Sequence, residues 1–136
     1  MADTVTTQTL LDGERLVIQK FTNISDGTGE TNVIKVNVSA LASDSYGIAC
    51  TGLKLNRVWS STHGMEVRIL WEATTPVMAW MVPQNTTYYM HFGDYFGGIP
   101  NNAGATGKTG NITFTTSDAS AGDMYTIVLE CIKVYG

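Results

Sequence analysis

The sequence has few of the residues that small proteins use for catalysis or for covalent cross-linking. Its 136 residues include only two cysteines, three prolines and two histidines. Neither Cys50 nor Cys131 belongs to a C-x-x-C motif, and nothing indicates an oxidising compartment, so we expect two reduced, partly buried thiols rather than a disulfide. A chain of this length forms one domain whose core needs no disulfide.

Long hydrophobic runs and clusters of positive charge are also missing. No uncharged run is long enough for a membrane helix, and the N-terminal residues do not follow the pattern of a secretory signal. The eight basic residues are scattered along a chain of net charge −4, whereas nucleic-acid binding usually needs a basic patch. We therefore expect a protein made in a cytoplasm, with neither a membrane nor a nucleic acid as its partner.

One segment imitates a nucleotide-binding motif. Gly107-Lys108-Thr109 ends like a phosphate-binding loop, but that motif requires a glycine where the sequence has Asn102. The residues that follow, NITFTT, alternate like a strand, so the helix N-terminus that would bind a phosphate is missing. We interpret the segment as a long flexible loop that leads into a strand.

The sequence is rich in the short alternating runs of β-strands. These runs are separated by turn clusters that contain glycine, asparagine and serine. The last run is apolar on both faces, so we expect a central strand or one that meets a partner subunit. We predict eight or nine strands from the runs at 5–11, 16–21, 34–38, 51–61, 65–71, 77–82, 86–92, 110–116 and 124–135.

The predicted fold class is all-β, with a single antiparallel β-sandwich over residues 12–136. A jelly-roll-like arrangement is preferred and an immunoglobulin-like sandwich is the alternative. Residues 1–11 are polar and poorly patterned for a core, so we treat them as an N-terminal arm that becomes ordered on a partner. Trp59 is in phase with the leucines at 53 and 55 and is expected in the core, whereas Lys35 is expected on the polar face of its strand.

Candidate catalytic or metal-binding groups are too few to form a site. His63 lies in a turn, and His91 with Asp94 supplies only two possible metal ligands. Glu66 and Glu72 share one face of a strand, but they are about 20 Å apart, which is too far for a pair of glycosidase carboxylates. We expect no enzymatic activity, no metal site and no cofactor.

Several phrases of the sequence resemble the small virion structural proteins of tailed bacteriophages. They are ADTVTTQTLLDGERLVIQKFTNISDGTGE, ILWEATTPV, GGIPNNAGATGKTGNITFTT and GDMYTIVLECIKV. The resemblance implies a capsid decoration, or cement, protein that is synthesised in the bacterial cytoplasm and located on the virion surface. It further implies a homotrimer whose partner is the major capsid protein of the assembled head.

The arm 1–11 and the loop 93–108 are the predicted contact surfaces, because loop aromatics on a rigid scaffold favour a contact role. Deleting residues 2–11 should weaken binding to the shell with little loss of fold. The alternatives are a receptor- or carbohydrate-binding module of a phage fibre, or another neck or tail component. The predicted contact residues are Thr4, Val5, Thr7, Leu10, Tyr95, Phe96, Asn101, Asn102 and Lys108.

Overall fold

The computed structural model describes residues 3–136, apart from the side chains of residues 94 and 95. Within this range the chain forms nine strands, with a single 3₁₀ turn, η1 (Val38–Ala40), and one four-residue helix, α1 (Gly93–Phe96). The all-β prediction is therefore confirmed. The strands are β1 (Thr4–Asp12), β2 (Leu16–Ile24), β3 (Val33–Val36), β4 (Cys50–His63), β5 (Glu66–Trp71), β6 (Val77–Val82), β7 (Thr87–His91), β8 (Ile112–Ser117) and β9 (Met124–Tyr135).

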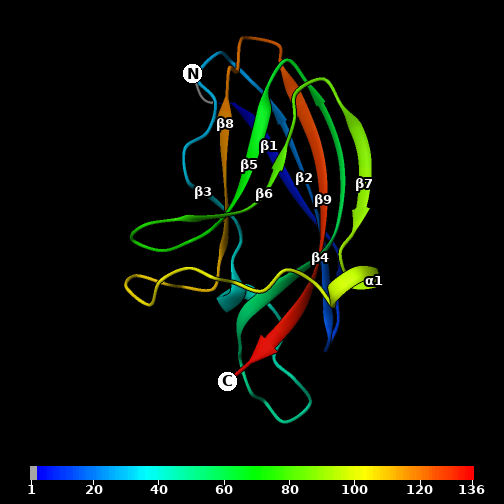
Figure 1. Ribbon diagram of the computed structural model, residues 1–136, viewed down its shortest axis with the longest axis vertical. Coiled ribbons are helices and arrows are strands. Elements are labelled where there is room, and N and C mark those ends of the chain that lie inside the picture. Colours follow the sequence, from blue (N-terminus) through cyan, green and yellow to red (C-terminus); the bar gives the residue numbers. More distant parts are fainter. Residues whose placement is uncertain (1–2) are drawn as a thin grey trace.

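The strands form two antiparallel sheets that face each other (Figure 1). The five-stranded sheet has the order β1-β2-β9-β4-β7, and the four-stranded sheet has the order β3-β8-β5-β6. The paired neighbours are β2 with β9, β3 with β8, β4 with β7, and β5 with β6. Each pair thus lies inside the previous one along the chain, and all are antiparallel. This order is that of a jelly roll with β1 added at one edge, and it excludes the immunoglobulin-like alternative. β9 lies in the middle of its sheet, as its two apolar faces predicted.

The core fills the space between the sheets. Trp71 and Phe114 from the four-stranded sheet and Phe21 and Tyr125 from the five-stranded sheet are all buried. The Phe114 ring meets Phe21 edge-on, with ring centroids 5.4 Å apart, and meets Tyr125 in the same way at 5.7 Å. Burying each such side chain contributes about 1.5–3 kcal/mol to stability, so these rings hold the sheets together.

A β-bulge in β4 reverses the faces that the sequence pattern assigns to its second half. The pairing of β4 with β9 slips between Leu55 and Arg57, so that Asn56 is an extra residue. After a slip of one residue every side chain changes face. Val58 therefore points into the core with no exposed surface, and Trp59 lies outside the core cluster. The prediction that Trp59 belongs to the core is wrong for this reason.

A second irregularity, in β3, buries a lysine. The pairing of β3 with β8 slips between Ile34 and Val36, and the intervening Lys35 is only 6% exposed. Its Nζ lies 2.5 Å from Oε2 of Glu30, whose Oε1 accepts a hydrogen bond of 2.6 Å from the Tyr125 hydroxyl. The prediction that Lys35 lies on a polar outer face is therefore wrong. The lysine points inward because a buried carboxylate accepts its charge.

The segment that the sequence suggested as an arm is the edge strand β1. Its residues pair with β2 from Thr4 to Asp12, with one bulge between Thr9 and Leu11, and all are exposed. The strand adds backbone hydrogen bonds but no buried core residue. Deleting it would leave the edge of β2 without a neighbour, and a free edge invites pairing with another chain. Point substitutions are therefore cleaner tests of this segment than deletion.

Gly110 precedes β8 and provides a test of the fold. Its φ is +85°, and a Cβ there would lie 2.1 Å from the backbone oxygen of Thr51. We expect Gly110→Ala to lower the free energy of unfolding by about 1–3 kcal/mol, because alanine is strained at this φ and has no room. Urea unfolding followed by circular dichroism measures the change.

The matched control is Gly104→Ala in the same connection. Gly104 has an ordinary φ and no atom within 4 Å of the added Cβ, so its substitution should change stability by less than about 0.5 kcal/mol. Equal effects of the two substitutions would contradict the packing described for Gly110.

Candidate functional site

The two ends of the sandwich differ in the length of their connections (Figure 1). One end carries the turns at 64–65, 83–86 and 118–123, and the connection 25–32. We call the other the long-loop end. It carries the β1–β2 turn (13–15), the β3–β4 loop (37–49), the β5–β6 loop (72–76) and the β7–β8 loop (92–111).

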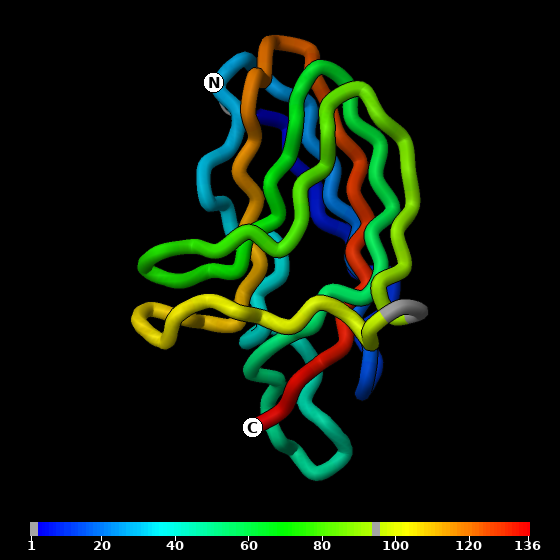
Figure 2. The backbone as a smooth tube through the Cα atoms, viewed as in Figure 1, coloured from blue at the N-terminus to red at the C-terminus, as the bar shows by residue number. Residues whose placement is uncertain are grey.

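The β7–β8 loop is fixed to the sandwich at several points along its length. Ile99 exchanges two backbone hydrogen bonds with Leu55, of 2.8 and 2.9 Å. Further along, the backbone oxygen of Thr106 accepts a hydrogen bond of 3.2 Å from Thr74 of the β5–β6 loop. Figure 2 shows the two loops extending in the same direction from the sandwich. The loop that the sequence predicted to be flexible is thus held to the sandwich at its base and to the β5–β6 loop further along.

The β3–β4 loop is attached to the β1–β2 turn beside it. The backbone N–H of Ala42 donates to the carboxylate of Asp12 at 3.0 Å, and that of Ser45 donates to the carboxylate of Glu14 at 3.1 Å. Lys133 of β9 also contacts Asp12 as an ion pair. The side chains that this loop carries are therefore held next to the end of β1.

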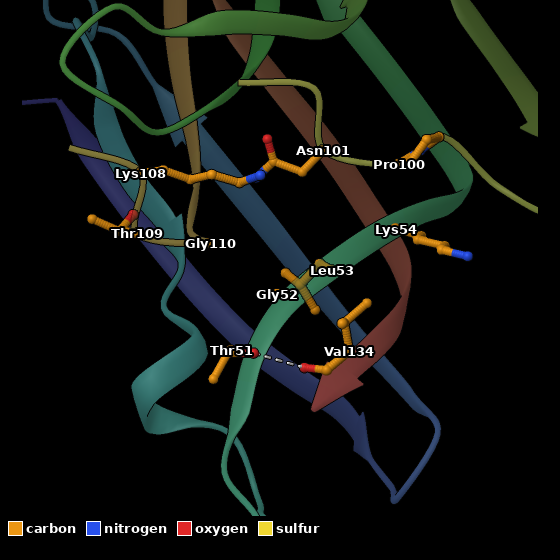
Figure 3. A pocket seen from close by; sticks show the side chains of 10 residues that line it. All are labelled: Thr51, Gly52, Leu53, Lys54, Pro100, Asn101, Lys108, Thr109, Gly110 and Val134. Atoms are coloured by element: carbon orange, nitrogen blue, oxygen red, sulfur yellow. Dashed lines mark hydrogen bonds between the residues drawn. The ribbon is translucent and has the colours of Figure 1, made fainter. Parts of the chain in front are cut away.

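A hollow opens between the β7–β8 loop, the start of β4 and the end of β9 (Figure 3). The side chains of Asn101 and Lys108 point toward each other across its upper rim, whereas Lys54 points away. Asn101 Oδ1 accepts a hydrogen bond of 2.9 Å from the backbone of Ala103. No carboxylate is among the described residues that line this hollow. Lys108 can therefore donate a hydrogen bond to a carbonyl or carboxylate group in this hollow.

Large apolar side chains are exposed around the same end. Tyr46 is 88% exposed and Phe96 is 62% exposed, which are the two highest values among the large apolar residues described. Aromatic side chains this exposed contribute little to the stability of the monomer, and they are enriched at protein interfaces. The exposed apolar residues of the long-loop end are Leu10, Leu11, Tyr46, Ile48, Phe96 and Val134.

The nine predicted contact residues do not form one surface. Thr4, Val5 and Thr7 are exposed, but they lie toward the short-turn end of β1, and Thr4 pairs with Ile24 at the end of β2. Thr4 and Leu10 are about 20 Å apart along the strand. The side chain of Tyr95 is outside the described residues. The predicted residues that do lie at the long-loop end are Leu10, Phe96, Asn101, Asn102 and Lys108.

Sequence reasoning missed Tyr46 and Ile48. The segment ASDSYG was interpreted only as a turn that separates two strands. The signal that could have identified them is a bulky aromatic among small polar residues, because such a ring has no core to enter from a turn. Their place beside the end of β1 depends on the tertiary fold and has no signal in the sequence.

The described residues contain no group of three or more His, Cys, Asp or Glu side chains placed to hold a metal ion. His63 is exposed at the end of β4, and His91 lies on β7 with its ring centroid 6.4 Å from that of Tyr89. The pair of His91 with Asp94 involves a side chain outside the described residues. The carboxylate of Glu72 accepts a hydrogen bond of 2.7 Å from the Thr109 hydroxyl. Within residues 3–136 no helix is long and apolar enough to cross a membrane.

Comparison with known proteins adds little to this geometry. Neither protein-family models nor curated protein sequences give a match to this chain. Among solved structures, the chain is similar to the polyketide cyclase RemF from Streptomyces resistomycificus, with 10% sequence identity and a TM-score of 0.32 over 98% of this chain and 69% of that one. A similarity this low identifies neither a family nor a function.

The reactivity of the two cysteines provides a test of their burial in the core. Both are free thiols, 4% and 1% exposed at Cys50 and Cys131, and burial raises the pKa of each above its ordinary value. Because the thiolate is the reactive form, we expect the native protein to react with Ellman's reagent far more slowly than the protein unfolded in guanidinium. Rapid reaction of either thiol in the native state would contradict the burial described.

Proposed function

We propose that this protein is a virion structural protein that decorates the outside of an assembled phage head, with the major capsid protein as its partner. The exposed apolar residues of the long-loop end support the proposal most directly. Tyr46, Ile48 and Phe96 are presented by connections of a jelly roll, an architecture also used by viral capsid and lectin domains. The resemblance of several sequence phrases to small phage virion proteins supports the same proposal.

The long-loop end combines the two kinds of contact that a shell-binding surface needs. Tyr46 and Phe96 supply apolar area, and an exposed apolar patch on a soluble protein is commonly an interaction site. Lys108 in the hollow supplies a charged hydrogen-bond donor that helps to fix orientation. The apolar area removed from water on binding contributes about 25 cal/mol per Å². The loss of translational and rotational freedom on association offsets much of this gain, so we expect one protomer to bind only weakly.

Avidity converts a weak contact into firm attachment. We propose a homotrimer, in which the second and third contacts with the shell are intramolecular and raise apparent affinity by about 10²–10⁴. Because the trimer fits only the assembled shell, it stabilises that state by mass action. An assembled head thereby gains stability without any change in the shell protein itself.

The outer face of the four-stranded sheet is our candidate for the contact between subunits. Strand pairing places Ile34, Leu70 and Met78 in one row across the sheet, with Thr113 between the first two. Ile34 and Met78 are each 48% exposed. An aliphatic row of this kind is typical of contacts between subunits.

Light scattering tests the trimer. We expect the purified protein to have the mass of a trimer and the variant Ile34→Glu/Met78→Glu to have the mass of a monomer, because charges at a dry contact are costly. The control is Ile24→Glu/Met124→Glu, a cross-strand pair 50% and 46% exposed on the other sheet, which should leave the mass unchanged. A monomeric wild-type protein would contradict the trimer.

Co-sedimentation with empty heads of the phage that encodes the chain tests the shell contact. We expect the wild-type protein to sediment in fixed ratio to the shell protein, and Tyr46→Ser/Phe96→Ser to lose at least about tenfold in affinity, since two apolar contacts are removed. The control variant Ile24→Ser/Met124→Ser should bind like the wild type. A wild-type protein that does not sediment with the heads would contradict the proposal and favour the fibre-module alternative.

A further inference from the structure

Two aromatic rings lie together on the outer face of the five-stranded sheet, away from the core. Trp59 of β4 and Tyr89 of β7 are cross-strand neighbours, with ring centroids 5.3 Å apart and planes inclined by 27°. Tyr89 is 45% exposed. Among the described residues, neither ring belongs to the core cluster or to the half-buried side chains that pack against it. The fold does not require these rings for its core.

A shallow hollow lies beside the two rings. Besides Trp59 and Tyr89, its walls include Ser61, Thr87, Thr126 and Val128. Strand pairing sets Ser61 of β4 between Thr87 of β7 and Thr126 of β9, so three hydroxyl side chains form a row across the sheet. The Ser61 and Thr87 hydroxyls are 3.1 Å apart. The hollow thus combines an aromatic wall with a row of groups that each donate and accept hydrogen bonds.

Charged side chains lie around the hollow but not in its walls. None of the described residues that line it is charged. In the adjacent row across the sheet, Arg57 and Glu130 pair with each other, with 2.9 Å between Nε and Oε2. Lys20 of β2 pairs with Val128 in the row of Trp59 and Tyr89, so one basic side chain borders the hollow beyond β9. A nucleic acid, which stacks its bases on aromatic rings but also requires positive charge along its backbone, is disfavoured because a single lysine does not make a basic groove.

We infer that this hollow binds a neutral saccharide. A pyranose ring presents weakly positive C–H groups on one face, which complement the negative face of an aromatic ring, and hydroxyls at its rim. The C–H face of the sugar would pack against Trp59 or Tyr89. Its hydroxyls would exchange hydrogen bonds with Ser61, Thr87 and Thr126. An apolar wall with a few convergent polar groups is the usual form of a small-molecule site.

A neutral saccharide fits this face better than a protein partner does. The aliphatic row of Ile34, Leu70 and Met78 is the kind of surface that proteins bury against each other, whereas this hollow sets a row of three hydroxyl-bearing side chains beside an aromatic wall. The hollow also lies toward the short-turn end, since the backbone of Thr62 in β4 bonds to Thr86 just before β7. A protein attached by its long-loop end would leave the hollow exposed. The inference does not depend on the proposed function.

Binding to immobilised neutral oligosaccharides tests the inference. The probes are oligomers of glucose, mannose, galactose and N-acetylglucosamine, with a sialylated set for comparison. We expect the full-length protein to bind at least one neutral series with a Kd of about 1 mM or below, and the sialylated set no better than the neutral one. Trp59→Ala should weaken this binding at least about tenfold.

Two further variants keep the test independent of folding. Thr126→Arg places a long side chain in the hollow while both rings are retained, so it should abolish binding. Tyr46→Ala removes an aromatic at the long-loop end that is more exposed than Tyr89, and it should bind like the wild type. Absence of binding to every neutral series, preference for the sialylated set, or full binding by Trp59→Ala or Thr126→Arg would overturn the inference. Head binding is measured separately and is unaffected by these outcomes.

Discussion

The two candidate surfaces of this protein depend on the β-bulge at Asn56, the extra residue in the pairing of β4 with β9. Its Nδ2 donates a hydrogen bond of 2.6 Å to Glu130, and its backbone oxygen accepts one of 2.8 Å from Phe92. A Cβ on Gly93 would lie 2.2 Å from Asn56 Oδ1, so any other residue after Phe92 would displace the Asn56 side chain. The bulge and the start of the β7–β8 loop are therefore packed against each other.

The consequences of this bulge reach both candidate surfaces. Beyond it, β4 turns its small and aliphatic side chains inward and Trp59 outward, which forms the aromatic wall of the saccharide hollow. Before it, Leu55 holds Ile99 by two backbone hydrogen bonds and fixes the course of the loop toward the long-loop end. A single inserted residue thus separates the hollow that we propose binds a saccharide from the end that we propose binds a protein shell.

A buried ionic contact closes the other end of the sandwich. Lys35, from the edge strand β3, reaches Glu30 and lies 5.7 Å from the centre of the Phe114 ring. Replacing one partner of such a pair is costly because the other is left buried and uncompensated. An inward charge on an edge strand also discourages that edge from pairing with another chain. The contact therefore favours the native register of β3. It also disfavours pairing of this sheet edge with a second chain.

The sequence by itself determined the fold class, the approximate positions of all nine strands and the central place of β9, because alternation, turn residues and a doubly apolar strand are local features. It also indicated the long loop and the exposure of Phe96. Only the tertiary structure decided that Trp59 lies outside the core and Lys35 inside it, since a bulge is fixed by the partner strand and not by the strand's own residues. Likewise, Leu10, Tyr46 and Phe96 are distant in sequence, and only the nested pairing of strands brings them to one end.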